Sequence, residues 1–230
     1  NTDILTAAPD HCLALSLANQ GDVSGAETVF LKILTKQTQN NLDNVKLDYA
    51  QFLSGQNRFM EALEKLHELI TANSSNIVAW RLGGQIALSR PEFLEFARDW
   101  TGEAMRYLGE NLALVEQRAE TLMLSGETLA AIELWERVWT GLAQPVALAA
   151  LILCETVESP TTHAPQDESE EMAASRAFIG WYRKLLSVKA HQTIVRLNGE
   201  TDKLSRALPG AAKILAATTA EVDRQNAVKV

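Results

Sequence analysis

The stretch Gly21-Asp22-Val23-Ser24-Gly25-Ala26-Glu27-Thr28-Val29-Phe30 joins a turn to the first part of a helix. Gly21 tolerates a left-handed backbone at no steric cost, which suits a tight turn. Ala26 and Phe30 are four residues apart, so they fall on one face of a helix. The same setting recurs along the chain with a small side chain in the same place each time, at Ala26, Ala62, Ala97 and Ala131.

The intervals between these four alanines are nearly constant, and each alanine follows a turn or helix-breaking signal. After the first turn, these signals are Gly55-Gln56-Asn57, Ser89-Arg90-Pro91 and Ser125-Gly126-Glu127. A period of about 34 residues is typical of stacked helix-turn-helix pairs. We therefore expect an all-α fold, an α-α superhelix, in which an alanine lies wherever two helices cross closely. Such arrays bind other molecules on a curved surface and rarely catalyse reactions.

The repeats predict three segments of different character. Residues 1–158 are expected to form the repeat array. Its units are predicted at about 7–40, at 43–76, from about 77, and at about 112–145, and residues 146–157 are predicted to be the first helix of a fifth unit. Residues 159–171 form an acidic loop with two prolines, which we expect not to pack. Residues 172–230 are predicted to form a C-terminal helical cap packed on the array, with one helix from about 170 to 197 and a last one near 211–225. The alternative for these C-terminal helices is a homodimer contact through Trp181 and Tyr182.

Residues 1–145 resemble the tetratricopeptide repeat. The match is carried by Trp80 with Leu82-Gly83, by Gly21-Asp22-Val23 with Ala26 and Phe30, and by Gly126 with Ala131 and Trp135. The chain departs from the pattern in two ways: the closing proline is missing after the first three units, and the aromatic residue of the third unit lies one place off register. The resemblance implies a helical-repeat fold and a role in holding a protein or peptide partner.

The amino-acid composition is typical of a globular, largely helical protein. Of its 230 residues, 47% are apolar and 22% charged. No apolar run approaches the roughly 18 residues that a membrane-spanning helix needs, so we expect no membrane-spanning helix.

The net charge is −8, but residues 172–230 carry more basic than acidic side chains. This asymmetry predicts either packing against the acidic array or contact with an acidic partner or membrane surface. Cys12 and Cys154 indicate no disulfide framework, so a reducing, cytoplasmic compartment is the default expectation. The chain does not begin with Met, which suggests a processed form or a fragment.

The sequence contains no motif that predicts catalysis. The four histidines lack the spacing of metal ligands, and no phosphate-binding loop or nucleophile elbow is present. Glu116 and Glu120 lie one helical turn apart, and we interpret them as part of a solvated face. An acidic array does not suit nucleic-acid phosphates. We therefore expect no enzyme activity, no metal, no cofactor and no nucleic-acid partner.

The resemblance implies that the first helix of each pair lines a concave binding face. On that basis, the predicted partner-binding residues are His11, Leu15, Leu47, Gln51, Trp80, Gly84, Glu116, Glu120 and Met123. Family members that hold a C-terminal carboxylate use Lys, Asn and Arg at such positions, and these are missing here. The predicted face suits an extended or helical segment with an apolar anchor and a basic residue. The alternative for Trp80 is a place in the core between helices.

Three functional hypotheses follow. The first is a non-catalytic scaffold that binds a peptide or protein segment. The second is a non-catalytic helical-repeat region of a larger enzyme, such as a glycosyltransferase, or of a secretion or assembly machine. The third is a scaffold that assembles with copies of itself.

Overall fold

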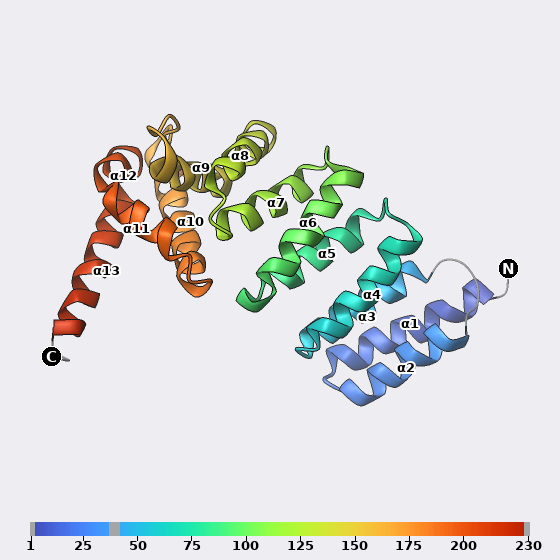
Figure 1. Cartoon of the computed structure of the whole chain (residues 1–230). Coiled ribbons are helices and arrows are strands. Elements are labelled where there is room, and N and C mark those ends of the chain that lie inside the picture. Colours follow the sequence, from blue (N-terminus) through green and yellow to red (C-terminus); the bar gives the residue numbers. More distant parts are fainter. Residues whose placement is uncertain (1–2, 37–41, 228–230) are drawn as a thin grey trace. The chain divides into compact units, whose positions relative to one another are not determined.

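The computed structural model describes residues 3–36 and 42–227, and within these ranges it contains only helices and the segments that join them (Figure 1). The predicted all-α fold is therefore confirmed. The predicted end of the first unit, near residue 40, lies outside the described residues. The chain divides into two compact units, Asn1–Ser89 and Arg90–Val230.

The first unit consists of two antiparallel helix pairs followed by a single helix. These are α1 (Asp3–Asn19), α2 (Val23–Lys36), α3 (Asp43–Gly55), α4 (Phe59–Ala72) and α5 (Ile77–Leu88). Helix α1 packs on α2 and α3 on α4, while α5 packs on both α4 and α3. The second helices α2 and α4 carry continuous apolar stripes, and this burial of one face stabilises short helices that would be marginal alone.

The second unit continues the alternation. It comprises the 3₁₀ turn η1 (Pro91–Phe93), α6 (Leu94–Leu108), α7 (Leu112–Leu124), α8 (Thr128–Leu142), α9 (Pro145–Glu158), α10 (Glu168–Ser187), α11 (His191–Gly199), α12 (Thr201–Ala207) and α13 (Pro209–Ala227). Each helix from α6 to α9 packs on the next. Helix α10 packs on α9 and α13, and α12 also packs on both of them.

The turns confirm the predicted glycine positions in part. Gly21 and Gly126 have φ values of 80° and 82°, in the left-handed region where glycine is unstrained. In the turn between α3 and α4, however, the left-handed residue is Asn57, with φ 61°, while Gly55 is the last residue of α3. Asparagine tolerates this conformation better than most residues, so the turn needs no glycine there. At the third turn Pro91 begins η1, as its missing N–H allows.

The four repeat alanines are all completely buried. They lie on α2, α4, α6 and α8, the second helix of each pair. A larger side chain at these positions would have to find room among packed neighbours. This confirms that the spacing of the alanines marks matching positions in successive pairs.

We expect Ala62→Leu to destabilise the first unit by about 1–3 kcal/mol, because three extra carbon atoms would overpack a buried position. Urea unfolding followed by circular dichroism measures this. The matched control is Ala72→Leu, which changes an exposed alanine on the same helix and should alter the free energy of unfolding by no more than about 0.5 kcal/mol. Equal effects of the two substitutions would contradict the assignment.

The C-terminal helices differ from the expected arrangement at two places. The predicted helix from 170 to 197 is in fact two helices, because Lys189 has φ 58° and separates α10 from α11. Helix α10 also begins earlier, at Glu168, where the Asp167 side chain accepts a hydrogen bond from the backbone N–H of Glu170. The connecting loop is therefore confined to residues 159–167.

The aromatic pair Trp181 and Tyr182 is packed inside the second unit. Each side chain is only 8% exposed. Trp181 lies edge-on to Trp135 of α8, with ring centroids 5.7 Å apart, and its Nε1 donates a hydrogen bond to the carbonyl of Val146. The pair is therefore not an exposed anchor for a second copy of the chain.

Candidate partner-binding groove

A hollow of about 530 Å³ lies on the first helices of the first unit. Helix α1 contributes His11, and α3 and α5 contribute four side chains each, namely Asn44, Leu47, Asp48 and Gln51 from α3 and Val78, Arg81, Leu82 and Gln85 from α5. We call this hollow the α1–α3–α5 groove. Its volume falls in the range of small-ligand and peptide-side-chain sites.

The lining residues of α3 and α5 occupy the same positions of two successive repeats. Positions 44, 47, 48 and 51 of α3 match positions 78, 81, 82 and 85 of α5, with the same offset in every pair. The N-cap residues Leu42 and Asn76 are separated by that same offset. Because the spacings of three, four and seven place side chains on one face of a helix, the repeat presents the same stripe to the groove twice.

Besides the titratable side chains of His11, Asp48 and Arg81, the groove contains an apolar surface and neutral amide groups. Leu47, Val78 and Leu82 supply the apolar part. The amides Asn44, Gln51 and Gln85 are exposed and carry both donors and acceptors. This combination suits a partner that offers an unpaired backbone together with an apolar side chain.

A close contact between a histidine and a carboxylate joins α1 and α3 at one side of the groove. His11 Nε2 of α1 lies 2.8 Å from Asp48 Oδ2 of α3, and the two side chains are 19% and 36% exposed. Phe30 of α2 lies edge-on to the His11 ring, 6.3 Å between centroids. These contacts fix the direction in which His11 points into the groove.

Three of the residues expected on the binding face line this groove, namely His11, Leu47 and Gln51. Leu15 is 37% exposed on α1 but does not line the hollow.

The two residues predicted on α5 are buried. Trp80 is 1% exposed and Gly84 is also buried, so neither is accessible to a partner. The residues of α5 that line the groove lie one residue further along the chain than the predicted ones. One residue corresponds to about 100° of rotation in an α-helix, which moves the groove stripe from Trp80 and Gly84 to Arg81 and Gln85.

Trp80 instead belongs to the core, the alternative that its repeat position allowed. Its Nε1 donates a hydrogen bond of 2.8 Å to the carbonyl of Ser74, in the turn between α4 and α5. The side chain therefore connects α5 to the preceding turn. It stabilises α5 from its buried face, and α5 carries the groove-lining residues Val78 to Gln85 on its other face.

The remaining expected residues lie on α7 of the second unit. Met123 is completely buried, and Glu120 is bonded to Lys184 of α10 with only 13% of its side chain exposed. Glu116 is half-buried. The positions of α9 that correspond to the groove stripe include Ala149, Ala150 and Leu153, which are all completely buried. In this unit the chain's own C-terminal helices therefore cover much of the first-helix surface.

Sequence reasoning missed a buried carboxylate. Glu155 of α9 is 4% exposed and accepts hydrogen bonds from the backbone N–H groups of Thr162 and His163 and from the Thr162 hydroxyl. His163 Nδ1 also lies 3.0 Å from Glu155 Oε1. Burial alone would raise the pKa of Glu155, but the bonds from Thr162 and His163 outweigh it and hold the pKa below its usual range. The loop expected not to pack is thus attached to α9 by this side chain.

The part of the chain that the structure describes contains neither a cluster of metal-ligand side chains nor a candidate membrane-spanning helix. Residues 3–36 and 42–227 contain no group of three or more His, Cys, Asp or Glu side chains placed to hold a metal ion. None of the helices in these ranges is both long and apolar enough to cross a membrane.

No protein-family model matches the chain, and no curated protein matches its sequence. Among solved structures, PilF of Pseudomonas aeruginosa is similar, with a TM-score of 0.54 and 15% identity over 94% of this chain and 100% of PilF. A thermophilic TPR protein of Thermus thermophilus has a TM-score of 0.49 and 17% identity, over 84% of this chain and 98% of that one. A MamA mutant also has a TM-score of 0.49, with 13% identity over 82% of this chain and 99% of that one. With its paired helices and buried repeat alanines, the chain has the fold of the tetratricopeptide-repeat proteins.

Proposed function

We propose that this chain is a non-catalytic protein-binding scaffold that holds an extended peptide segment of a partner in the α1–α3–α5 groove. The observation that carries the proposal is the repetition of one stripe. Two successive first helices present the same four positions to a single open hollow. A partner segment that runs across the helices would meet the same amide at each repeat, Gln51 and then Gln85, and different side chains at the other three positions.

The side chains of the groove suit an extended backbone. Gln51 and Gln85 are equivalent, exposed amides, and each can donate to a carbonyl and accept from an N–H of the bound segment. Leu47, Val78 and Leu82 would hold one apolar side chain of the partner between them. The binding energy would come from that anchor, and the amides would fix the register of the peptide.

The charge expected of the partner changes with this assignment. The acidic residues Glu116 and Glu120, which suggested a basic partner, lie in the other unit, and Glu120 already pairs with Lys184. Within the groove, Asp48 is paired with His11. Arg81 also lines the groove, so the proposal calls for an apolar anchor and does not call for a basic partner. A homodimer through the C-terminal helices is not part of it, since Trp181 and Tyr182 are buried.

A displayed library of random peptides tests the proposal with the whole chain as bait. We expect it to yield peptides that share an apolar residue, and Val78→Glu to weaken their binding at least about tenfold, because the charge would have to be desolvated against the anchor. Val78 is 58% exposed and is the second residue of α5, so the substitution should leave the fold intact. Calorimetric titration of the selected peptides measures the change.

Met60→Glu is the matched control. Met60 is 56% exposed and is the second residue of its own helix, α4, but it lies outside the groove. It should change peptide affinity by no more than about twofold, consistent with a surface change remote from the site. If Met60→Glu weakens binding as much as Val78→Glu does, or if no peptide is selected at all, the groove is not the binding site.

A further inference from the structure

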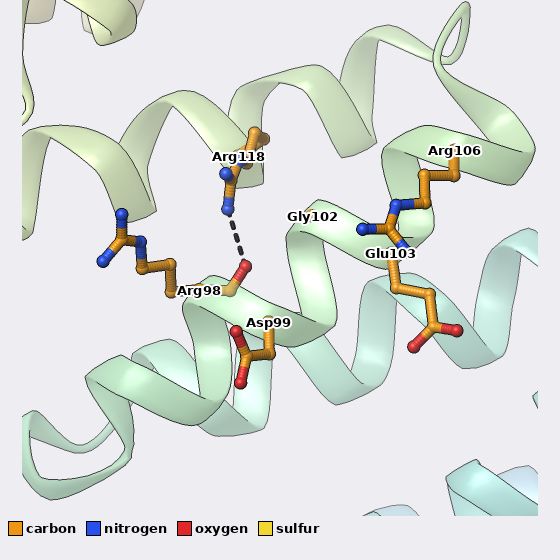
Figure 2. Close-up of a pocket in the computed structure, with 6 residues that line it drawn as sticks. All are labelled: Arg98, Asp99, Gly102, Glu103, Arg106 and Arg118. Atoms are coloured by element: carbon orange, nitrogen blue, oxygen red, sulfur yellow. Dashed lines mark hydrogen bonds between the residues drawn. The ribbon is translucent and has the colours of Figure 1, made fainter.

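A second hollow, of about 600 Å³, lies between α6 and α7 of the second unit and is lined by three arginines, Arg98, Arg106 and Arg118 (Figure 2). Arg98 and Arg106 are eight residues apart on α6, with Gly102 midway between them. Spacings of four put all three residues on one face of the helix. Gly102 therefore leaves a gap between two cationic side chains.

Arg118 of α7 reaches into that gap. Its Nη1 donates a hydrogen bond of 2.6 Å to the carbonyl of Arg98 and lies 3.4 Å from the Thr101 hydroxyl. A Cβ atom at residue 102 would be only 3.3 Å from the same nitrogen. Glycine is a poorer helix former than alanine, and here the missing side chain makes room for a guanidinium group.

Two of the three arginines form no ion pair with the described part of the protein, although the charges of Glu127 and Asp99 act on Arg118 and favour its charged form. Arg98 forms an ion pair with Glu127, 2.9 Å between Nη2 and Oε1. Within the residues that the structure describes, neither Arg106 nor Arg118 forms an ion pair, and the groups that hold Arg118 are neutral oxygens. Burial lowers the pKa of Arg118, which reflects the cost of keeping a charge in this place. An arginine remains charged nonetheless.

We propose that this hollow binds a single phosphate monoester, held between Arg106 and Arg118 over Gly102. Arginine offers paired N–H donors that match phosphate oxygens. The two guanidinium groups without an ion pair supply donors and positive charge for one phosphoryl group, whose charge is about −1.5 to −2 at neutral pH, against the opposing charges of Asp99 and Glu103 in the same hollow. The hollow is larger than a phosphate ion, so the phosphoryl group would be carried on a side chain or a small organic molecule.

The acidic neighbours restrict the ligand to one phosphoryl group. Asp99 and Glu103 line the same hollow on the adjacent stripe of α6. They would repel a second phosphate placed one step further along, whereas a nucleic-acid backbone needs a continuous row of cations. A phosphorylated partner or small phosphate ester therefore fits the site better than RNA or DNA does. This proposal does not depend on the α1–α3–α5 groove, which lies in the other unit.

Titration of the full chain with phenyl phosphate at constant ionic strength, followed by amide and arginine side-chain NMR signals, tests the site. We expect saturable shifts at Gly102 and at the Arg106 and Arg118 side chains, with benzoate, a monoanion, binding at least about fivefold more weakly. Inorganic phosphate should shift the same signals. If it binds as tightly as phenyl phosphate, the occupant is the free ion and the ester assignment is wrong.

Arg106→Gln should weaken phenyl phosphate binding about tenfold, the loss expected for one hydrogen bond between charged groups. Arg106 is exposed, so its loss should not disturb the helix. Arg183→Gln is the matched control, because it removes the same charge from an exposed position of α10, in the same unit but outside the hollow. It should change the affinity less than about twofold.

Two further variants separate a specific site from general attraction. Gly102→Ala should weaken phenyl phosphate binding at least about threefold, because the methyl group fills the gap beside Arg118. The double substitution Asp99→Asn and Glu103→Gln should tighten it about threefold by removing repulsion. The proposal is overturned if phenyl phosphate produces no saturable shift, if Arg183→Gln weakens binding as much as Arg106→Gln, or if oligonucleotides bind more tightly as their length increases.

Discussion

Trp80→Ala should destabilise the first unit by about 3–5 kcal/mol, the usual effect of truncating a buried tryptophan. Trp80 is 1% exposed and its Nε1 is bonded to the carbonyl of Ser74. The substitution therefore leaves a large cavity beside α5 and also removes the bond to the preceding turn. A loss of this size is a large part of the stability of a domain of this length.

Urea unfolding followed by circular dichroism measures this loss, with a midpoint expected to fall by about 1 M or more. The remaining four tryptophans all lie after residue 89, so their fluorescence reports on the second unit and should change little. If Trp80→Ala weakens peptide binding while the unfolding curve stays in place, Trp80 is a partner-binding residue after all and the assignment to the core is wrong.

Trp135→Ala should cost a similar amount, about 3–5 kcal/mol, but in the second unit. Trp135 is completely buried on α8 and packs edge-on against Trp181 of α10. Removing it takes away the aromatic surface on which α10 rests, so we expect α10 to lose protection from amide hydrogen exchange before α6 does. Equal loss of protection across α6 and α10 would show that the contact does not hold the C-terminal helices.

The corresponding phenylalanine variants compare the two tryptophans more closely. Trp80→Phe loses the hydrogen bond to Ser74, whereas Trp135 Nε1 is buried without a hydrogen-bond partner within the described part of the chain. We therefore expect Trp80→Phe to cost about 1 kcal/mol more than Trp135→Phe. A larger cost for Trp135→Phe would indicate that its N–H has a partner.

The architecture followed from local signals in the sequence. The buried alanines and the glycine turns recur with the period of one helix pair, and each effect acts within a few residues, so it can be recognised without coordinates. Asn57 shows the limit of this reasoning. The glycine at residue 55 suggested the turn position, but the backbone takes its left-handed residue two places later.

The face of α5 that lines the groove was harder to predict because it depends on register. The predicted positions of α5, Trp80 and Gly84, lie 33 residues after Leu47 and Gln51 of α3, whereas the groove positions Arg81 and Gln85 lie 34 residues after them. Extending the stripe along α5 with a one-residue error rotates it by about 100°, which selected Trp80 and Gly84 in place of the groove positions. The spacing of the N-cap residues Leu42 and Asn76 would have given the correct register.

Contacts between segments that are distant in the sequence could not be predicted, because no local sequence pattern marks them. Glu120 is bonded to Lys184 and Glu155 to the loop at Thr162, and only the packing of α10 and the path of the loop after α9 bring these groups together. A single sequence shows that such residues are charged or polar. It does not show which of them are paired within the chain and which remain open to a partner.

Photo-crosslinking tests the central claim, that the α1–α3–α5 groove holds the partner, most directly. A benzophenone amino acid is placed at Gln51, at Gln85 or at Met60, all of them exposed positions of the first unit, and each chain is irradiated with a library-selected peptide. We predict crosslinked product from Gln51 and Gln85, none from Met60, and competition by excess unlabelled peptide. Crosslinking from Met60 alone, with none from either glutamine position, would contradict the account.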